Sequence, residues 1–160
     1  MANSITGWNT FTPGTTIRSA EVNSNFTSLL EEAPLLQKYT IPYTTYSAMG
    51  AVAAGTATAF SLTASDVIHG VLLKHTASFA GTSISAAKIT VGIPGSPDRY
   101  VADFDVFQTV SAGAVSLNRL FECEFSATSL IVSISLTGGN LSALNAGSID
   151  IYVQKSKLPS

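Results

Sequence analysis

From Tyr39 onward the chain alternates apolar and polar residues in short runs, and turn-forming Gly, Pro and Ser residues separate the runs. A period of two places successive side chains on opposite faces of a strand. Because no helix-length segment interrupts the runs, a parallel α/β sheet is disfavoured. The pattern predicts a mainly β protein, a jelly-roll-like antiparallel β-sandwich. About eight strands are expected, at 39–46, 56–64, 66–76, 83–93, 99–108, 117–126, 129–137 and 148–155, with a turn at 94–98.

Ahead of these runs lies one short segment with the period of a helix. Ser19 is a favourable N-cap, and Pro34 ends the segment. About fifteen residues make a helix of about 22 Å, which is marginally stable alone. Its apolar stripe must therefore pack on the chain's own body, on copies of itself or on another protein. The stripe consists of Val22, Phe26, Leu29, Leu30 and Ala33.

Residues 1–18 lack regular periodicity and predict an extended arm. Trp8 and Phe11 are large apolar groups in an otherwise small and polar stretch, so the arm is either a floppy terminus or an anchor. The anchoring interpretation assigns the contact to Trp8, Phe11 and Ile17. We therefore divide the chain into an N-terminal arm and helix at 1–38 and a sandwich body at 39–160.

Composition narrows the classes of partner. Charged residues make up 11% of the 160 residues, and the formal net charge is −2. Eight scattered Lys and Arg residues form no basic stripe, so a nucleic-acid partner is not expected. The sequence shows no apolar run long enough for a membrane span and no signal peptide, which predicts synthesis in a cytoplasm. Cys123, the single cysteine, is interpreted as a small buried hydrophobe.

Two carboxylate pairs have the i, i+2 spacing that places both members on one face of a strand, namely Asp103 with Asp105 and Glu122 with Glu124. They are interpreted as the solvent face of amphipathic strands. Two alternatives stay open: a divalent-ion site if the two strands are neighbours, and a pair of acids for polysaccharide hydrolysis.

No other catalytic pattern is found. His69 and His75 share a strand face but lie about 20 Å apart, too far for one metal ion. Serine residues are numerous, yet none sits in a G-x-S-x-G elbow, and no glycine-rich stretch carries the lysine of a phosphate loop. The sequence therefore predicts a protein that is not an enzyme, with no cofactor and no metal.

The segment "FTPGTTIRSAEVNSNFTSLL" (11–30) resembles the opening segment of many bacteriophage virion proteins. The body more loosely resembles small phage β-sandwich proteins, through "YTIPYT", "IHGVLLKHTASFAGTSISAAKITVGI", "LSALNAGSIDIYV" and the final "KLP". The residues that carry the first resemblance are Phe11, Gly14, Thr15, Ile17, Ala20, Val22, Asn23, Asn25, Phe26, Leu29 and Leu30.

This resemblance implies a structural module located in the virion, often trimeric, that decorates a capsid or forms a short fibre. The chain has no repetitive stalk and no large receptor domain, which favours a capsid decoration or cement protein, or a short head fibre. The implied partners are two further copies in a C3 ring and the major capsid protein or another virion protein. Three arms would bind tightly through their high effective concentration.

Two questions remain open at this stage. The helix could lie on the threefold axis or on its own sandwich, and its short stripe does not decide between them. The alternative function is a tail- or fibre-associated adhesin that binds a host glycan or protein. Exposed aromatic rings would then stack on sugars, and the candidates are Tyr43, Tyr46 and Tyr100.

Overall fold

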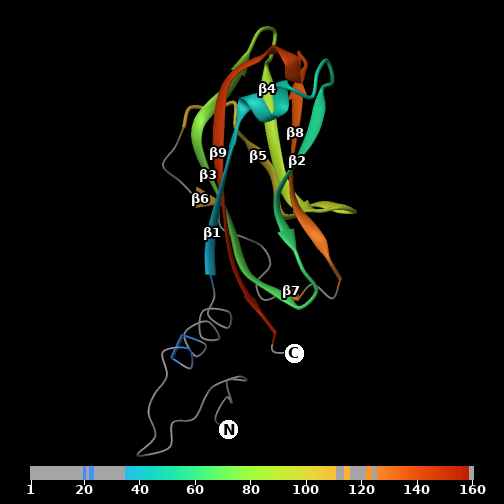
Figure 1. Cartoon of the computed structure of the whole chain (residues 1–160). Coiled ribbons are helices and arrows are strands. Elements are labelled where there is room, and N and C mark those ends of the chain that lie inside the picture. Colours follow the sequence, from blue (N-terminus) through green and yellow to red (C-terminus); the bar gives the residue numbers. More distant parts are fainter. Residues whose placement is uncertain are drawn as a thin grey trace, which may run out of the picture.

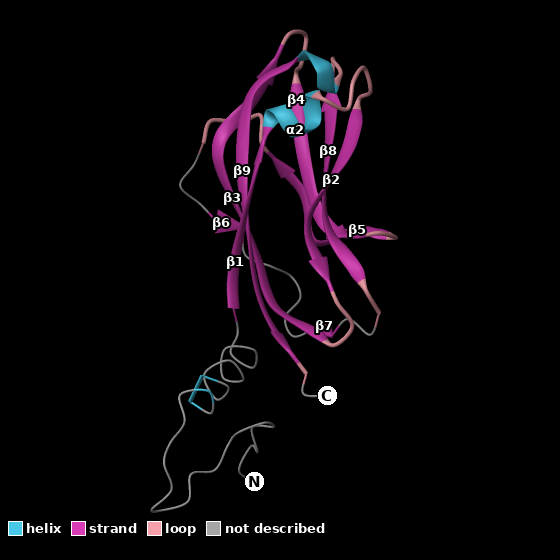
Figure 2. Cartoon of the chain, viewed as in Figure 1, coloured by secondary structure: helices cyan, strands magenta, loops and turns pink. Residues whose placement is uncertain are grey.

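The computed structural model describes residues 20, 22–23, 35–110, 114–115, 122–123 and 126–158. Two antiparallel sheets pack face to face in this part of the chain (Figure 1, Figure 2). Seven long strands, two strands of two residues and two short helices make up the body. They are β1 (Leu35–Pro42), α2 (Tyr43–Ser47), β2 (Ala54–Leu62), β3 (Asp66–Gly81), β4 (Ala86–Ile93), β5 (Ser96–Asp105), β6 (Ala114–Val115), β7 (Glu122–Cys123), β8 (Thr128–Thr137), the 3₁₀ helix η1 (Leu141–Ala143) and β9 (Leu144–Lys157).

The order of the strands is that of a jelly roll. The five-stranded sheet has the order β1-β9-β3-β6, and β7 also pairs with β3. The four-stranded sheet has the order β2-β8-β4-β5. Among the seven long strands, the chain crosses between the sheets after every strand except β4, which continues into β5 of the same sheet. This arrangement confirms the predicted jelly-roll-like antiparallel β-sandwich.

The core lies between the two sheets and follows the predicted alternation. Along β8, for example, Leu130, Val132 and Ile134 are buried, and the residues between them are partly exposed. Burial of these side chains from both sheets is the main source of stability, at about 25 cal/mol per Å² of apolar surface. The largest fully buried side chains are Tyr46, Tyr100, Phe79, Ile41, Leu62, Ile68, Leu73, Ile89, Leu130, Ile134, Leu141 and Ile149.

The first predicted strand is wrong in its second half. β1 ends at Pro42, and Tyr43–Ser47 forms one turn of α-helix. The motif "YTTY" places its two tyrosines three residues apart, which puts both on one face of a helical turn, whereas a strand would point them to opposite faces. Packing decides the outcome, because Tyr46 is fully buried and its hydroxyl donates a hydrogen bond to the carbonyl of Val132 at 3.1 Å.

The fifth predicted strand is displaced toward the N-terminus. The turn is only Pro94–Gly95, and β5 begins at Ser96, so part of the expected turn at 94–98 belongs to the strand. β5 ends at Asp105 because its carboxylate accepts hydrogen bonds from the backbone N–H groups of Phe107 (2.9 Å) and Gln108 (3.3 Å). This capping contact turns the chain out of the sheet.

The two long central strands extend beyond their expected bounds. β3 continues to Gly81 and β9 begins at Leu144, where Gly147 has a φ of +130°. A Cβ atom on Gly147 would lie 2.4 Å from the ring of Phe79, so this position requires glycine for the close approach as well as for its backbone. Among the described residues, 117–126 contributes only β7.

The N-terminal boundary also differs in detail. β1 begins at Leu35, so residues 35–38, which the sequence division placed with the arm and helix, pair with β9. The few described residues of the predicted helix, Ala20, Val22 and Asn23, are helical, and Val22 is half-buried. Leu35 pairs with Lys155, so β1 begins beside the end of β9, and α2 lies at the opposite end of the sandwich (Figure 1).

Candidate interaction surfaces

The first carboxylate pair has roles within the fold. Asp105 caps the segment after β5, as described above, and Asp103 lies 3.8 Å from the exposed amine of Lys88. Asp103 has a φ of +48°, and the β4–β5 register shifts between the pairs Ile89–Phe104 and Val91–Val101, so the simple alternation is interrupted beside this pair.

The second carboxylate pair lies elsewhere. Glu122 belongs to β7, which pairs with β3 in the five-stranded sheet, whereas Asp103 and Asp105 belong to the four-stranded sheet. The two strands are therefore not paired neighbours, which was the condition for a shared divalent-ion site. Glu124 lies outside the described residues. Within the described ranges no three His, Cys, Asp or Glu side chains form a group that could hold a metal ion.

The two histidines are not on one face as expected. The β3–β9 register shifts between Ile68 and Gly70, which interrupts the alternation between His69 and His75. His69 is half-buried and within 2.7 Å of the hydroxyl of Ser156. His75 instead faces the core, where its ring meets Phe104 edge-on at 6.1 Å.

The tyrosines of the adhesin hypothesis lie in or against the core. Tyr46 and Tyr100 are buried, and Tyr43 packs against the core cluster. The rings of Tyr46 and Tyr100 are therefore unavailable for stacking on a sugar, and the ring of Tyr43 is partly covered by the core. Burial also raises the pKa of Tyr46, which keeps its hydroxyl protonated as a hydrogen-bond donor. Of the predicted anchoring and helix residues, Val22 is the one that the structure describes. The others, outside the described residues, are Trp8, Phe11, Ile17, Phe26, Leu29 and Leu30.

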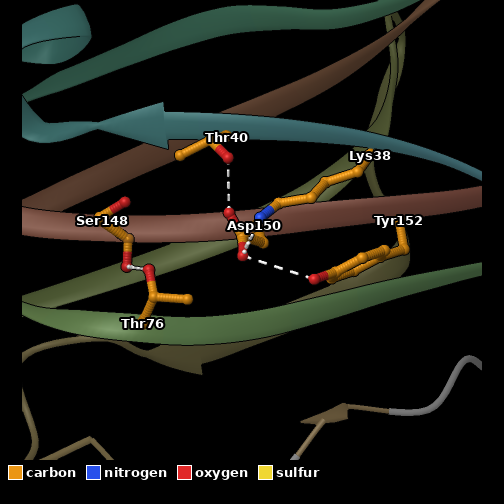
Figure 3. Close-up of polar contacts among 6 residues, drawn as sticks. All are labelled: Lys38, Thr40, Thr76, Ser148, Asp150 and Tyr152. Carbon is orange, nitrogen blue, oxygen red and sulfur yellow. Dashed lines mark hydrogen bonds and ion pairs between the residues drawn. The ribbon is translucent and has the colours of Figure 1, made fainter.

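A polar cluster lies on the outer face of the five-stranded sheet, centred on Asp150 of β9 (Figure 3). Its carboxylate accepts hydrogen bonds from the hydroxyl of Thr40 (2.6 Å) and the amine of Lys38 (2.8 Å). Tyr152 approaches at 3.5 Å, and Asp150 is only 5% exposed. Burial alone would raise the pKa of Asp150, but the bonds from Lys38 and Thr40 hold it below its usual value. The cluster joins β1 to β9.

A second ion pair lies near the C-terminal end of β9. Lys155 is 2.9 Å from Asp66, which also accepts bonds from the backbone N–H (2.9 Å) and hydroxyl (3.0 Å) of Thr63. Burial raises the pKa of Asp66, whereas the bonds from Thr63 and Lys155 lower it, and the net effect is a lowered pKa. This pair fixes the start of β3 against the end of β9.

Exposed large hydrophobic side chains are distributed unevenly over the described residues. None lies on β2, β4, β5 or β8, which together form the four-stranded sheet. They occur on β1 and β3, in the loop after α2, in the segment after β5 and just beyond β9. These side chains are Leu36, Tyr39, Met49, Val52, Leu72, Phe107, Val110 and Leu158. Clusters of exposed apolar groups are typical of surfaces that meet another molecule.

The outer face of the four-stranded sheet is rich in hydroxyl groups. Thr56, Ser133 and Thr90 are aligned across β2, β8 and β4, and the hydroxyls of Thr56 and Ser133 are 2.8 Å apart. A shallow depression of about 320 Å³ lies along this row. It presents neutral hydroxyls and no titratable group, so it has no evident catalytic chemistry.

Sequence reasoning did not single out the exposed residues of β1 and of the segment after β5 as a surface. Phe107 was recognisable as out of phase with the alternation of the preceding strand. Leu36 carried no signal of its own, because a leucine in a strand is most often buried. Its exposure of 66% follows from its outward phase on an edge strand, on the same face as Lys38 and Thr40.

Comparison with known proteins places the fold among phage capsid structures. A chain of the capsid asymmetric unit of cyanophage Pam1 aligns with a TM-score of 0.56 at 19% identity, over 79% of this chain and 87% of that chain. A chain in the acid-stable capsid of Helicobacter pylori bacteriophage KHP30 aligns with a TM-score of 0.55 at 15% identity, over 81% and 91%. The likeness is one of fold.

Comparisons at the level of sequence identify no related protein. No protein-family profile matches the chain, and no curated protein sequence matches it. None of the helices among the described residues is long and apolar enough to cross a membrane.

Proposed function

We propose that the chain is a structural protein of a bacteriophage virion, a trimeric capsid decoration or cement protein without enzymatic activity. The observation that carries the proposal is the jelly-roll fold shared with the two phage capsid chains over most of both lengths. Because the alignments cover at least 87% of those chains, the likeness is to nearly entire capsid components.

The N-terminal segment provides the attachment. Its sequence resembles the opening segments of phage virion proteins, and it enters the body at β1, an edge strand of the five-stranded sheet. Trp8, Phe11 and Ile17 contact the shell, and the stripe of Val22, Phe26, Leu29 and Leu30 packs at the threefold axis of the trimer. Three arms on one particle raise the effective concentration of the second and third contacts after the first has formed.

The test is attachment to shells. Shells stripped of this protein are mixed with the full chain and with a chain that lacks residues 1–33, and bound protein is counted after sedimentation. We expect loss of binding by at least tenfold, because the arm supplies the contact. A double substitution of Trp8 and Phe11 by Ala should reproduce much of the loss in a chain of full length. Undiminished binding of the shortened chain would contradict the proposal.

An adhesin function has less support from the structure. Its candidate rings are Tyr43, Tyr46 and Tyr100, which lie in or against the core. Microscopy of virions with labelled protein separates the two functions. Label spread over the head supports decoration, and label confined to the tail supports the adhesin.

A further inference from the structure

We propose that residues 106–110 form an acid-releasable strap: when His75 takes up a proton, the strap leaves the side of the sandwich while the two sheets stay folded. The strap follows β5 and is bonded to β3 and to β4. The inference concerns the body of a single chain, so it goes beyond the proposed function and does not depend on it.

The starting point is the ring of His75, which is 1% exposed and has one nitrogen atom without a hydrogen-bond partner among the described residues. Its Nε2 atom lies 3.1 Å from the carbonyl oxygen of Ala77. Because a carbonyl oxygen only accepts hydrogen bonds, Nε2 carries the hydrogen and Nδ1 is the bare nitrogen. A buried polar atom without a partner lacks the hydrogen bond that water would give it. An opening that admits water to Nδ1 restores that bond.

The end of β5 and the strap lie against this ring. Phe104 meets the imidazole edge-on, with 6.1 Å between the ring centroids. Burial lowers the pKa of His75, and the charge of Asp105 and the carbonyl of Val106 offset this effect only in part. A charged ring needs solvation that the closed strap excludes. The closed sandwich therefore keeps His75 neutral, and the residues that shield it belong to the strap and to the strand before it.

Few contacts hold the strap in place. The N–H of Phe79 donates to the carbonyl of Val106 at 2.9 Å, and the N–H of Val106 donates to the carbonyl of Ala87 at 3.0 Å. The hydroxyl of Ser78 donates to the carbonyl of Gln108 at 2.7 Å. Val106 is the one strap residue whose side chain is buried. Since β3 and β9 pair over most of their lengths, releasing the strap breaks far fewer contacts than unfolding the sheets.

The charged groups around His75 do not stabilise a protonated ring in the closed state. Asp105 acts on the ring, but its carboxylate already accepts hydrogen bonds from two backbone N–H groups of the strap. Attraction to a charged ring therefore competes with the contacts that shape the strap. Lys74 of β3, Lys88 of β4 and Asp150 of β9 lie on the outer faces of the sheets. The tyrosines buried in the same core are Tyr46 and Tyr100.

Release of the strap becomes easier as the pH falls. In the open form the ring meets water and has a pKa of about 6.5, whereas the pKa of the closed ring is lowered. Because the open form binds more protons, the equilibrium constant for opening rises by at most about tenfold for each pH unit below about 6.5. Phe107 and Val110 are exposed and move with the strap, so acid changes the apolar surface on this side of the molecule.

Hydrogen exchange of the full-length chain tests the strap, followed by NMR at pH 7.5 and pH 5 and corrected for the intrinsic pH dependence of exchange. The probes are the amides of Phe79 and Val106, whose hydrogen bonds break on release. The reference amides are those of β8, which is paired on both sides. We expect the probes to exchange faster than the reference amides, with protection that falls by up to about 30-fold between the two pH values.

Matched variants separate the proton from the contacts. His75→Gln keeps an N–H donor for the carbonyl of Ala77 but does not titrate, so its probe amides should show equal protection at both pH values. His75→Leu serves the same purpose if His75→Gln does not fold. His69→Gln, which removes the other histidine, should behave as the wild type does.

Two outcomes would overturn the inference. Probe amides that exchange no faster than those of β8 at either pH would show that the strap opens only when the whole sandwich unfolds. A pH dependence that persists in His75→Gln would assign the proton to another group. Both results are read from the purified chain, so they are distinct from shell attachment, which tests the proposed function.

Discussion

The two sheets of the sandwich differ in where they place charge and exposed apolar surface. All three buried polar or charged residues of the described ranges lie on the five-stranded sheet, namely Asp66, His75 and Asp150. The exposed large hydrophobics also avoid the strands of the four-stranded sheet. That sheet shows water a row of neutral hydroxyls. Buried charge and exposed apolar side chains thus lie on the five-stranded sheet and in the connecting segments, while the four-stranded sheet presents hydroxyl groups to solvent.

The largest effect on stability is expected for Asp66→Asn. The substitution removes the charge opposite Lys155 and one of the acceptors for Thr63. Because both partners are largely shielded from water, we expect a loss of about 2–3 kcal/mol in the free energy of unfolding, measured by urea denaturation. Since the pKa of Asp66 is lowered in the folded state, this stability is present above pH about 3.9 and is lost as the pH falls below it.

Asp66→Asn is compared with wild type at neutral pH and again at pH about 3. The difference in free energy of unfolding between the two proteins should shrink at the lower pH, because the carboxyl of the unfolded wild-type chain is largely protonated there and the stability that its lowered folded-state pKa provides is partly lost. A difference that stays constant between the two pH values would contradict the assignment of the stability to the ion pair.

A smaller loss is expected for Asp150→Asn on the outer face of the same sheet. Asp150 is as buried as Asp66, but its partner Lys38 is half-exposed and can be solvated by water once the carboxylate is gone. We therefore expect a loss of about 1–2 kcal/mol by urea denaturation. Lys38→Met is the matched control for the other side of the pair. If Asp150→Asn lowered the free energy of unfolding as much as Asp66→Asn does, the greater exposure of Lys38 relative to Lys155 would not explain how the two ion pairs differ.

The third prediction concerns His75, whose ring faces the core of the five-stranded sheet. Burial lowers its pKa, and the carbonyls of Ala77 and Val106 and the charge of Asp105 only partly offset this effect. The unfolded chain therefore takes up a proton more readily than the folded chain below pH about 6.5. The free energy of unfolding should therefore decrease as the pH is lowered through that window, by at most about 1.4 kcal/mol per pH unit.

Urea denaturation between pH 5 and pH 7.5 checks this slope, and His75→Leu should remove it. The chain holds two histidines, so His69→Gln is the natural control and should retain the slope. Loss of the slope in His69→Gln, with retention in His75→Leu, would show that the wrong histidine had been assigned.

Much of the fold could be predicted because alternation is a local property. In β8 the four buried positions, Leu130, Val132, Ile134 and Leu136, alternate with less buried positions that are serines except for Ile131, so burial largely follows the alternation. The prediction fails at Tyr43–Ser47, where a stretch too short to establish a period forms a helical turn whose Tyr46 bonds to distant Val132. It also fails where a side chain ends a strand, as Asp105 does at the end of β5.

Less of the candidate surface could be predicted, since it depends on which strands lie at the edges. Leu36 and Ile41 belong to the same strand, yet one is 66% exposed and the other is fully buried. Residue type does not separate them, but the two residues are five apart in a regular strand, so Ile41 points into the core and Leu36 points to the outer face. The bond between Lys38 and Asp150 likewise joins residues that are distant in the sequence, so spacing alone gives no sign of it.

The smallest effect is expected on the hydroxyl face of the four-stranded sheet. Thr56 and Ser133 share a hydrogen bond of 2.8 Å, but both hydroxyls are open to water, which replaces the bond when one partner is removed. The double variant Thr56→Ala with Ser133→Ala should therefore change the free energy of unfolding by no more than about 0.5 kcal/mol. A loss of stability as large as that of Asp150→Asn would show that side-chain hydrogen bonds on the two sheets contribute alike, and the distinction between the two sheets would no longer hold.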